Sequence, residues 1–336
     1  MSGRPFVVIG ASAGGVESLR AVVRGFPPDL PATVLVVLHT TPGGSSVLAP
    51  ILDRSGPLPA TAAVDGELLE TGHIYVAPPD HHLTVLAGRC SLSRGPQENG
   101  HRPAVDPLFR SAVRAAGSAV VGVVLSGMLD DGAAGLAAIA RHSGAAVVQH
   151  PEDALYPGMP TAALAAVPDA TTAAAEKIGS VIAELVGQDP AIDALGEDPL
   201  LHQETAIAEL DMDALDDPDR PGDPAGLGCP DCSGALFAVR EGPLTRYRCR
   251  VGHAWSPDSL LERQNSAMEG ALWMALRTME DKAALHRRLA ESATDRGTPF
   301  VATRNLDAAA ELGESIRLIR ELLAREPPGR EAPGQQ

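Results

Sequence analysis

The fold is decided by the stretch FVVIGASAGG, residues Phe6–Gly15. Its first four residues, Phe6–Ile9, are apolar and β-branched or aromatic, which predicts a buried strand. Small residues follow and permit a tight turn, and Val16–Gly25 continues with the spacing of an amphipathic helix. A strand, a glycine-rich turn and a helix in this order indicate the first unit of an α/β fold.

The same alternation continues to about residue 187. The sequence predicts further strands at Thr33–Leu38, His73–Ala77, Ser118–Leu125 and Ala145–Gln149, a hairpin at His82–Arg89, and helices at Ser46–Leu52, Asp106–Ala116, Gly132–His142, Ala162–Val167 and Glu176–Val186. Continuously apolar strands separated by helices are typical of a parallel sheet covered on both faces. We therefore expect a doubly wound, mostly parallel α/β domain over residues 1–187.

Ser12 lies in the turn after the first strand. The pattern Gly10-x-Ser12-x-Gly14 fits a nucleophile elbow, in which small neighbours lift a serine hydroxyl clear of the sheet. A serine at a helix N-terminus also has backbone N–H groups nearby that favour a developing oxyanion. The alternative is a turn that binds phosphate or only connects two elements.

His39, Asp130 and Asp131 also follow predicted strands. Because active sites of open parallel sheets form outside the carboxyl ends of the strands, these side chains and Ser12 are expected at one edge. Taken singly, His39 could be a loop residue and the aspartates a helix cap. Together they predict a Ser-His-Asp triad, in a chain order that differs from the Ser…Asp/Glu…His order of α/β-hydrolases.

Six blocks between about residues 5 and 185 resemble the catalytic domain of CheB-type chemotaxis protein-glutamate methylesterases. They are VVIGASAGG (Val7–Gly15), VVLH (Val36–His39), YVAPPDHHL (Tyr75–Leu83), HRPAVDPLF (His101–Phe109), LSGMLDDGAAGL (Leu125–Leu136) and PGMP (Pro157–Pro160). The resemblance implies a domain that hydrolyses glutamyl methyl esters on chemoreceptors and, in some members, deamidates glutamines. A methylated chemoreceptor-like protein is then the expected substrate partner.

The resemblance also implies roles for individual residues. Ser12 is the nucleophile, His39 the base and Asp131 the acid, with Asp130 a solvated neighbour. The remaining cleft and oxyanion candidates are Ala13, Met128, His101 and Arg102, of which the last two could equally be exposed loop residues. The chain departs from the family at Leu38 and Thr40-Thr41, where members usually have Gln and Met-Pro, and at Asp130, where many have Asn.

Family members that act in chemotaxis usually begin with a phospho-accepting receiver domain, whereas here the first catalytic strand begins at Phe6. We therefore expect no control by phosphorylation within this chain. A C-terminal extension is then the candidate for regulation. The alternative to an enzyme is a non-catalytic signalling module that keeps the fold for binding.

The chain of 336 residues has a net charge of −16, and residues 188–224 carry 12 of its acidic side chains against one arginine. This segment is predicted to be an acidic linker. An acidic protein is a poor partner for nucleic acid. The sequence shows neither a membrane-spanning apolar run nor a signal peptide, which favours a cytoplasmic protein.

Cysteines concentrate in residues 225–257. Cys229-x-x-Cys232 and Cys249-x-x-x-His253 match the ligand spacing of a structural zinc site, which predicts a zinc-ribbon-like hairpin. The alternative is a metal-free hairpin. Cys90 lies apart on a predicted strand and is expected to be a buried thiol. No cofactor is expected for catalysis.

Residues 258–325 have the pattern of two long amphipathic helices, predicted to form a hairpin. The alternative for their apolar positions is a surface for a signalling partner or a dimer. The Pro-, Gly- and Glu-rich tail, residues 326–336, is predicted to be disordered.

Overall fold

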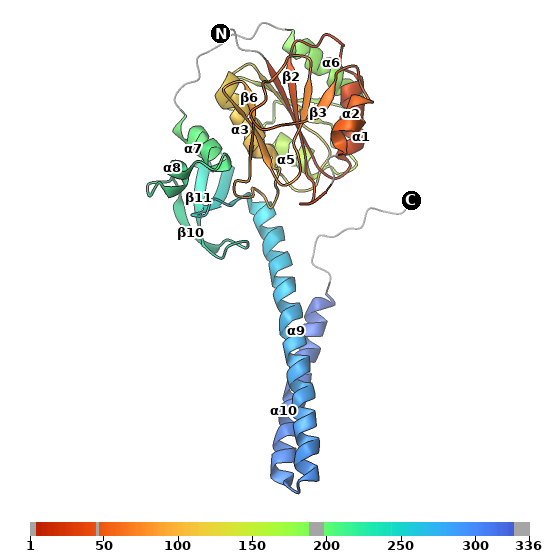
Figure 1. Cartoon of the computed structure of the whole chain (residues 1–336), viewed down its shortest axis with the longest axis vertical. Helices are drawn as coiled ribbons and strands as arrows, with labels where there is room; N and C mark the ends of the chain where they lie inside the picture. The colour runs from red at the N-terminus through yellow and green to blue at the C-terminus, as the bar shows by residue number, and fades with distance from the viewer. Residues whose placement is uncertain (1–4, 45–46, 188–197, 243, 326–336) are drawn as a thin grey trace. The chain divides into compact units, whose positions relative to one another are not determined.

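The computed structural model describes residues 5–44, 47–187, 198–242 and 244–325 (Figure 1). The chain divides at Leu260 into two units, Met1–Leu260 and Leu261–Gln336.

A seven-stranded parallel sheet forms the centre of the first unit. Its order is β3-β4-β2-β1-β7-β8-β9, so the chain winds outward in both directions from β1 and β7. The strands are β1 (Phe6–Ala11), β2 (Thr33–Leu38), β3 (Ala60–Ala62), β4 (Ile74–Val76), β7 (Val120–Val124), β8 (Ala145–Gln149) and β9 (Thr171–Ala173). This order confirms the predicted doubly wound sheet.

Helices cover both faces of this sheet because successive strand residues point to opposite sides. On β1, Val7 and Ile9 belong to one buried cluster and Val8 to the other. The first cluster packs under α1 (Gly15–Arg24), α2 (Leu48–Asp53) and α6 (Ala175–Val186), and the second under α3 (Val105–Ala116), α4 (Ala133–Arg141) and α5 (Gly158–Ala166). Figure 1 shows the two layers on either side of the strands.

The predicted hairpin is formed by β5 (His82–Leu86) and β6 (Arg89–Ser93), which pair antiparallel and pack on α3. Cys90 on β6 is 1% exposed, as expected for a buried thiol. Burial and the neighbouring Glu67 carboxylate raise the pKa of this thiol to about 12.

The expected acidic linker requires correction. Two helices, α7 (Pro199–Ala208) and α8 (Met212–Asp216), lie within it, capped by Asp198 and Asp211, and residues 188–197 lie outside the described part of the chain. Other acidic side chains of the segment pair with arginines from elsewhere, among them Glu209 with Arg114 at 2.5 Å. The charge that indicated a solvated linker is therefore partly neutralised by tertiary contacts.

The Cys-rich segment forms a four-stranded antiparallel sheet in the order β10-β11-β12-β13. Its strands are β10 (Asp223–Gly228), β11 (Ala235–Glu241), β12 (Leu244–Cys249) and β13 (Ala254–Trp255). Trp255 is fully buried beside Cys229, Cys249 and Leu260. We call residues 223–260 the Cys-His module. It belongs to the same unit as the parallel sheet.

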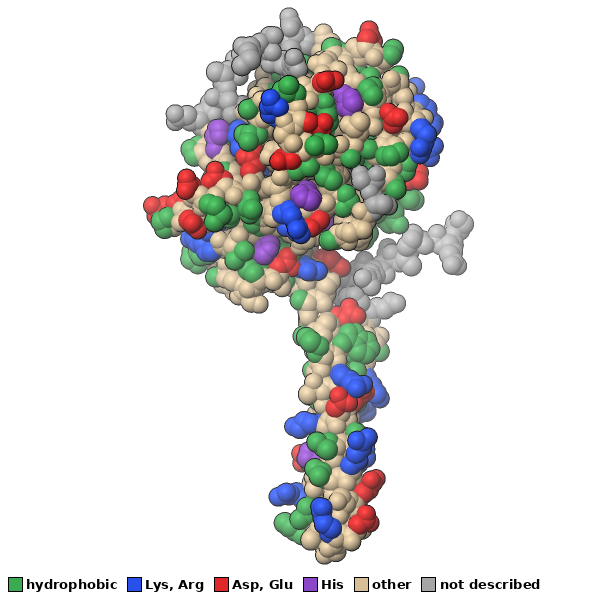
Figure 2. All heavy atoms as spheres, viewed as in Figure 1, with side chains coloured by type: hydrophobic (Ala, Val, Ile, Leu, Met, Phe, Trp, Pro, Cys, Tyr) green, Lys and Arg blue, Asp and Glu red, His purple; other side chains and the backbone are tan. Residues whose placement is uncertain are grey.

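The second unit is a helical hairpin, as predicted. It is formed by α9 (Pro257–Asp295) from Leu261 onward and by α10 (Pro299–Leu323). Small side chains such as Ala283, Ala290 and Ala309 are buried within it, and His286 Nδ1 lies 2.8 Å from Asn305 Oδ1. On the face in Figure 2, basic, acidic and hydrophobic side chains are interspersed along both helices. The predicted disordered tail lies outside the described residues. None of the described helices has an apolar stretch sufficient to cross a membrane.

Gly10 on β1 provides a test of this packing. A Cβ at position 10 would lie 2.3 Å from Val105 Cγ1, so Gly10→Ala must displace α3. We expect the free energy of unfolding of the first unit to fall by about 1–3 kcal/mol, the usual cost of overpacking. Urea titration of the variant measures it. Gly187→Ala, where the nearest contact would be 3.4 Å, is the control and should unfold like the unmodified protein.

Candidate active site at the carboxyl edge of the sheet

Ser12 and His39 lie at the carboxyl ends of adjacent strands. β1 and β2 pair in parallel with Ala11 opposite Leu38, so the next residues of the two strands are neighbours. The backbone N–H of His39 donates to the carbonyl of Ala11 at 3.1 Å, and the N–H of Ser12 donates to that of Ser126 at 2.9 Å. The turn that carries Ser12 is thus held between β2 and the segment after β7.

Asp131 contacts His39 from the loop between β7 and α4. His39 Nε2 lies 2.7 Å from Asp131 Oδ2, which also accepts the backbone N–H of Val105 at 2.6 Å. Burial alone would raise the pKa of Asp131, but the hydrogen bond and charge of His39 and the N–H of Val105 together hold it well below its usual range. The carboxylate is therefore ionised at neutral pH and only accepts hydrogen bonds.

This contact determines the protonation of the neutral imidazole. Because Asp131 can only accept, the proton must lie on His39 Nε2, and Nδ1 is the acceptor nitrogen. Nδ1 is buried and has no hydrogen-bond partner among the described residues. The acceptor nitrogen of this imidazole is unoccupied, and Ser12 directly follows the neighbouring strand β1. Such a nitrogen can accept a hydroxyl proton.

The backbone around Ser12 is closely packed. Gly14 adopts a left-handed φ of 70° at the start of α1, and Ala13 accepts a hydrogen bond from the Ser126 hydroxyl at 2.8 Å. A Cβ on Gly127 would lie 2.9 Å from Ser12 Cβ, so the segment before Met128 approaches the serine closely. The Met128 side chain itself is 59% exposed. Of the predicted oxyanion candidates, Ala13 thus follows Ser12 directly, and Met128 follows the glycine that approaches Ser12.

His101 stacks on His39, with ring centroids 3.7 Å apart and planes inclined by 12°. Burial, followed by the charge of His39, lowers the pKa of His101 to about 4. His101 is therefore neutral at pH 7 and supports the His39 ring as an uncharged surface.

Arg102 is already paired. Its guanidinium donates to Asp80 at 2.9 and 2.6 Å and to the carbonyls of Arg94 and Gly95. The charge of Arg102 is therefore balanced by Asp80 within the protein, and its guanidinium is engaged in these contacts instead of facing an open cleft.

Asn99 and Asp106 were not among the residues predicted for the site. The Asn99 amide donates to Asp131 Oδ1 at 3.0 Å, and Asp106 Oδ1 accepts the N–H groups of Gly132 and Gly135 at the start of α4. Burial and the nearby Asp131 charge raise the pKa of Asp106 to about 7. For Asn99, the sequence did contain a signal: the dipeptide Asn99-Gly100 is typical of a two-residue hairpin turn.

Asp130 was expected to be a solvated neighbour, and the structure corrects this. One of its oxygens accepts the hydroxyls of Ser256 at 2.7 Å and Ser259 at 2.8 Å, both from the Cys-His module. Burial raises its pKa above the usual value, while these two hydrogen bonds act in the opposite direction. The residue next to Asp131 is therefore a contact between the loop that follows β7 and the module.

The predicted metal ligands come together in the Cys-His module. One ligand atom from each of Cys229, Cys232, Cys249 and His253 lies within 4.8 Å of the others. Cys232 Sγ is 3.6 Å from Cys249 Sγ, and His253 Nδ1 is 3.7 Å from Cys229 Sγ and 3.6 Å from Cys249 Sγ. Tetrahedral zinc with bonds of about 2.0–2.3 Å requires ligand separations of about 3.5–3.8 Å. These four residues could therefore hold a metal ion.

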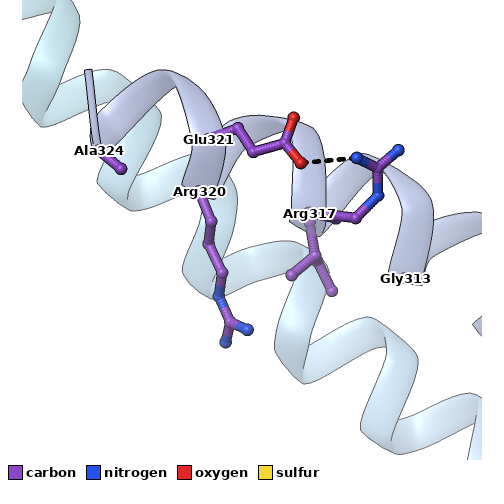
Figure 3. Close-up of a pocket in the computed structure, with 6 residues that line it drawn as sticks. Gly313, Arg317, Arg320, Glu321 and Ala324 are labelled. Atoms are coloured by element: carbon purple, nitrogen blue, oxygen red, sulfur yellow. Dashed lines mark hydrogen bonds and ion pairs between the residues drawn. The ribbon is translucent and has the colours of Figure 1, made fainter.

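A hollow lies on the surface of α10 (Figure 3). Its lining includes Gly313, Ile316, Arg320 and Ala324, and Arg317 is paired with Glu321 at 2.6 Å. None of its lining residues is a nucleophile, an imidazole or a thiol. The chemistry of the described chain therefore lies at the sheet edge and in the Cys-His module.

Fold and site together define a doubly wound α/β protein with serine, histidine and aspartate at the edge where strand order reverses. The profile of the family described as CheB methylesterase matches residues 7–182. The chain belongs to this family, which confirms the resemblance seen in the sequence.

Individual relatives agree. Residues of this chain are 44% identical over 161 positions to protein-glutamate methylesterase/protein-glutamine glutaminase 3 of Anaeromyxobacter dehalogenans, covering 47% of each chain. They are 39% identical over 169 positions to the enzyme of that name from Yersinia pestis, covering 49% of this chain and 48% of the relative. The match thus spans about half the length of these curated relatives.

Among solved structures, the catalytic domain of Thermotoga maritima CheB methylesterase superposes with a TM-score of 0.53 at 33% identity. All of that domain and 55% of this chain are covered. The matched part is the α/β domain, so the Cys-His module and the hairpin lie beyond the family match.

The stacked histidine predicts a pH dependence of stability. An unfolded imidazole binds a proton near pH 6.5, whereas folded His101 binds one near pH 4. Between these values the unfolded chain binds more protons, so acidification destabilises the fold. His101→Phe keeps a ring on His39 but cannot titrate. When the pH is lowered from 7 to 5, the free energy of unfolding should fall in both proteins. The fall should be about 1–2 kcal/mol smaller in His101→Phe than in the unmodified protein. Urea titrations at both pH values test this, and equal losses would contradict it.

Proposed function

We propose that this protein is a serine-dependent protein-glutamate methylesterase that acts on methylated chemoreceptor-like proteins in the cytoplasm and also deamidates glutamine. Family membership and the names of the relatives support the reaction class. The observation that carries the proposal is the His39–Asp131 contact, which leaves the acceptor nitrogen of His39 unoccupied beside the strand that leads to Ser12.

In the proposed reaction, Ser12 Oγ attacks the ester carbonyl while His39 Nδ1 takes the hydroxyl proton of Ser12. Asp131 stabilises the imidazolium that forms and keeps its ring oriented. Backbone N–H groups at the start of α1 and next to Met128 stabilise the oxyanion. As the tetrahedral intermediate collapses, His39 returns the proton to the methoxy oxygen, which leaves as methanol, or to the amide nitrogen of a glutamine substrate, which leaves as ammonia. Water hydrolyses the acyl-enzyme by the same steps and frees Ser12.

Ser12→Ala tests the nucleophile. We expect methanol release from a methylated receptor fragment to fall by at least about 10³-fold, because removing a triad nucleophile leaves only binding and oxyanion stabilisation. Ser180→Ala is the matched control, since Ser180 is exposed on α6 and its hydroxyl bonds only the Lys177 carbonyl among the described contacts. A serine-reactive phosphonate should label the unmodified protein and the control but not the Ser12 variant.

Two outcomes would contradict the proposal. Turnover that survives in Ser12→Ala would exclude this nucleophile. Absence of both turnover and phosphonate labelling in the unmodified protein would favour the alternative, a non-catalytic signalling module on the same fold.

We further propose that Cys229, Cys232, Cys249 and His253 bind a structural zinc ion. The donor set of three thiolates and one imidazole, and its tetrahedral separations, support zinc over magnesium or calcium, which prefer oxygen ligands. A site with four protein ligands has no open position for substrate, so the ion would stabilise the module and take no part in the reaction.

Metal analysis of the purified protein tests this. We expect about one zinc ion per chain, and loss of that zinc in Cys232→Ser, because three ligands bind far more weakly than four. Cys90→Ala is the control, since Cys90 lies on β6 outside the cluster and should leave the zinc content unchanged. Zinc-free wild-type protein, or a Cys232 variant that retains zinc, would be inconsistent with the site.

A further inference from the structure

One short turn supports two of the proposed catalytic residues. Residues Glu98–His101, here called the support turn, close with reciprocal backbone hydrogen bonds between Glu98 and His101. Asn99 and Gly100 in its centre both have positive φ, 52° and 76°. Asn99 donates to Asp131, and His101 stacks on His39. The position of this turn therefore decides how the imidazole and its carboxylate face each other.

The Cys-His module holds the same turn from the other side. The backbone N–H of Ser256 donates to Asn99 Oδ1 at 2.8 Å, and the N–H of Asn99 donates to the Ala254 carbonyl at 2.8 Å. The N–H of Ala254 in turn donates to the Gln97 carbonyl at 3.2 Å. The Asn99 side chain is thus buried between the catalytic carboxylate and the module, with one end of its amide bonded to each.

Charge strengthens this attachment. Glu98 is fully buried and accepts hydrogen bonds from Arg110 on α3 at 2.7 Å and from Arg246 and Arg248 on β12 at 2.9 Å each. Burial opposes ionisation of Glu98, but these three guanidinium groups hold its pKa well below its usual range. A charged carboxylate in the support turn is therefore bound by two arginines of the module.

The metal ligands lie next to these contacts in the chain. Cys249 follows Arg248 at the end of β12, and His253 precedes Ala254 at the start of β13. The N–H of Cys249 also donates to the His253 carbonyl at 3.0 Å. An ion that joins Cys249 and His253 to the first two cysteines would thus fix both segments that contact the support turn.

We propose that Asn99 is a positioning residue, and that metal binding in the Cys-His module controls the alignment of Asp131 with His39 through it. This inference rests on the proposed function, since it concerns the same triad. It also makes the module part of the catalytic apparatus, with a metal-dependent effect on a site that contains no metal ligand.

Asn99→Gly is the informative variant, because glycine keeps the positive φ of the turn and removes only the amide. We expect kcat to fall about 10–100-fold, as for other residues that orient a catalytic group, with KM changed less than about twofold. Ser143→Gly is the matched control. It replaces an exposed residue whose φ is 61°, at the end of α4. A fall in kcat for both variants, or for neither, would overturn the inference.

A spectroscopic measurement makes the test independent of substrate. The His39 Nε2–H proton, bonded to a carboxylate at 2.7 Å, should give a far-downfield ¹H resonance in protein with ¹⁵N-labelled histidine. Its loss in His39→Gln assigns it. We expect this resonance to shift or broaden in Asn99→Gly and in Cys232→Ser, and to be unchanged in Ser143→Gly. An unaltered resonance in Asn99→Gly would overturn the inference even if no esterase activity were found.

The double variant Asn99→Gly/Cys232→Ser separates coupling from two independent losses. If the metal acts through Asn99, the double variant should lose about as much kcat as Asn99→Gly alone, since interacting sites are not additive. Losses that multiply would show that the module affects activity by another route, and would overturn the inference. If Ser12→Ala retained turnover, the proposed function would fail, while the resonance test of Asn99 would stand.

Discussion

The first unit depends on the buried carboxylate of Glu98. A charge that has left water must find partners inside the protein, and removing a partner from such a group costs about 3–5 kcal/mol. Glu98 finds three arginines, Arg110 on α3 and the pair Arg246 and Arg248 on β12. Glu204 on α7 shares the β12 pair. This requirement joins the parallel-sheet domain, α7 and the Cys-His module into one unit.

A second constraint acts at the sheet edge. β1, β2 and β7 are adjacent and parallel, so the residues that follow these strands emerge together at the same edge of the sheet. Ser12, His39 and Asp131, far apart in the chain, become neighbours for this reason. Asp131 accepts hydrogen bonds from His39, Asn99 and Val105, and the contacts with His39 and Val105 lower its pKa against the effect of burial. The low pKa of this carboxylate is thus a property of the assembled edge and not of the local sequence.

Much of this could be predicted from sequence. The positions of β1, β2, β4, β7 and β8 follow from apolar runs, and the cluster of Cys229, Cys232, Cys249 and His253 from ligand spacing, because both signals are local. The short edge strands β3 and β9 were not predicted. The prediction of a solvated acidic linker was wrong because a count of charges does not show which acidic side chains pair with arginines in the folded protein. Glu204 and Glu209 are paired with arginines far from them in the chain, and two helices form where a solvated linker was expected.

Local sequence patterns are enough to predict the α/β order, the carboxyl-edge placement of Ser12, His39 and Asp131, and the clustering of Cys229, Cys232, Cys249 and His253. Each depends on residues close in the chain or on the direction of a strand. Tertiary packing alone brings Asn99 between Asp131 and the module, Asp130 to Ser256 and Ser259, and Glu98 among three arginines. These contacts join residues more than 100 positions apart, except those of Asn99 with Asp131 and of Glu98 with Arg110. Buried charges and amides are satisfied by whichever donors the packed elements bring near, and no local pattern specifies those.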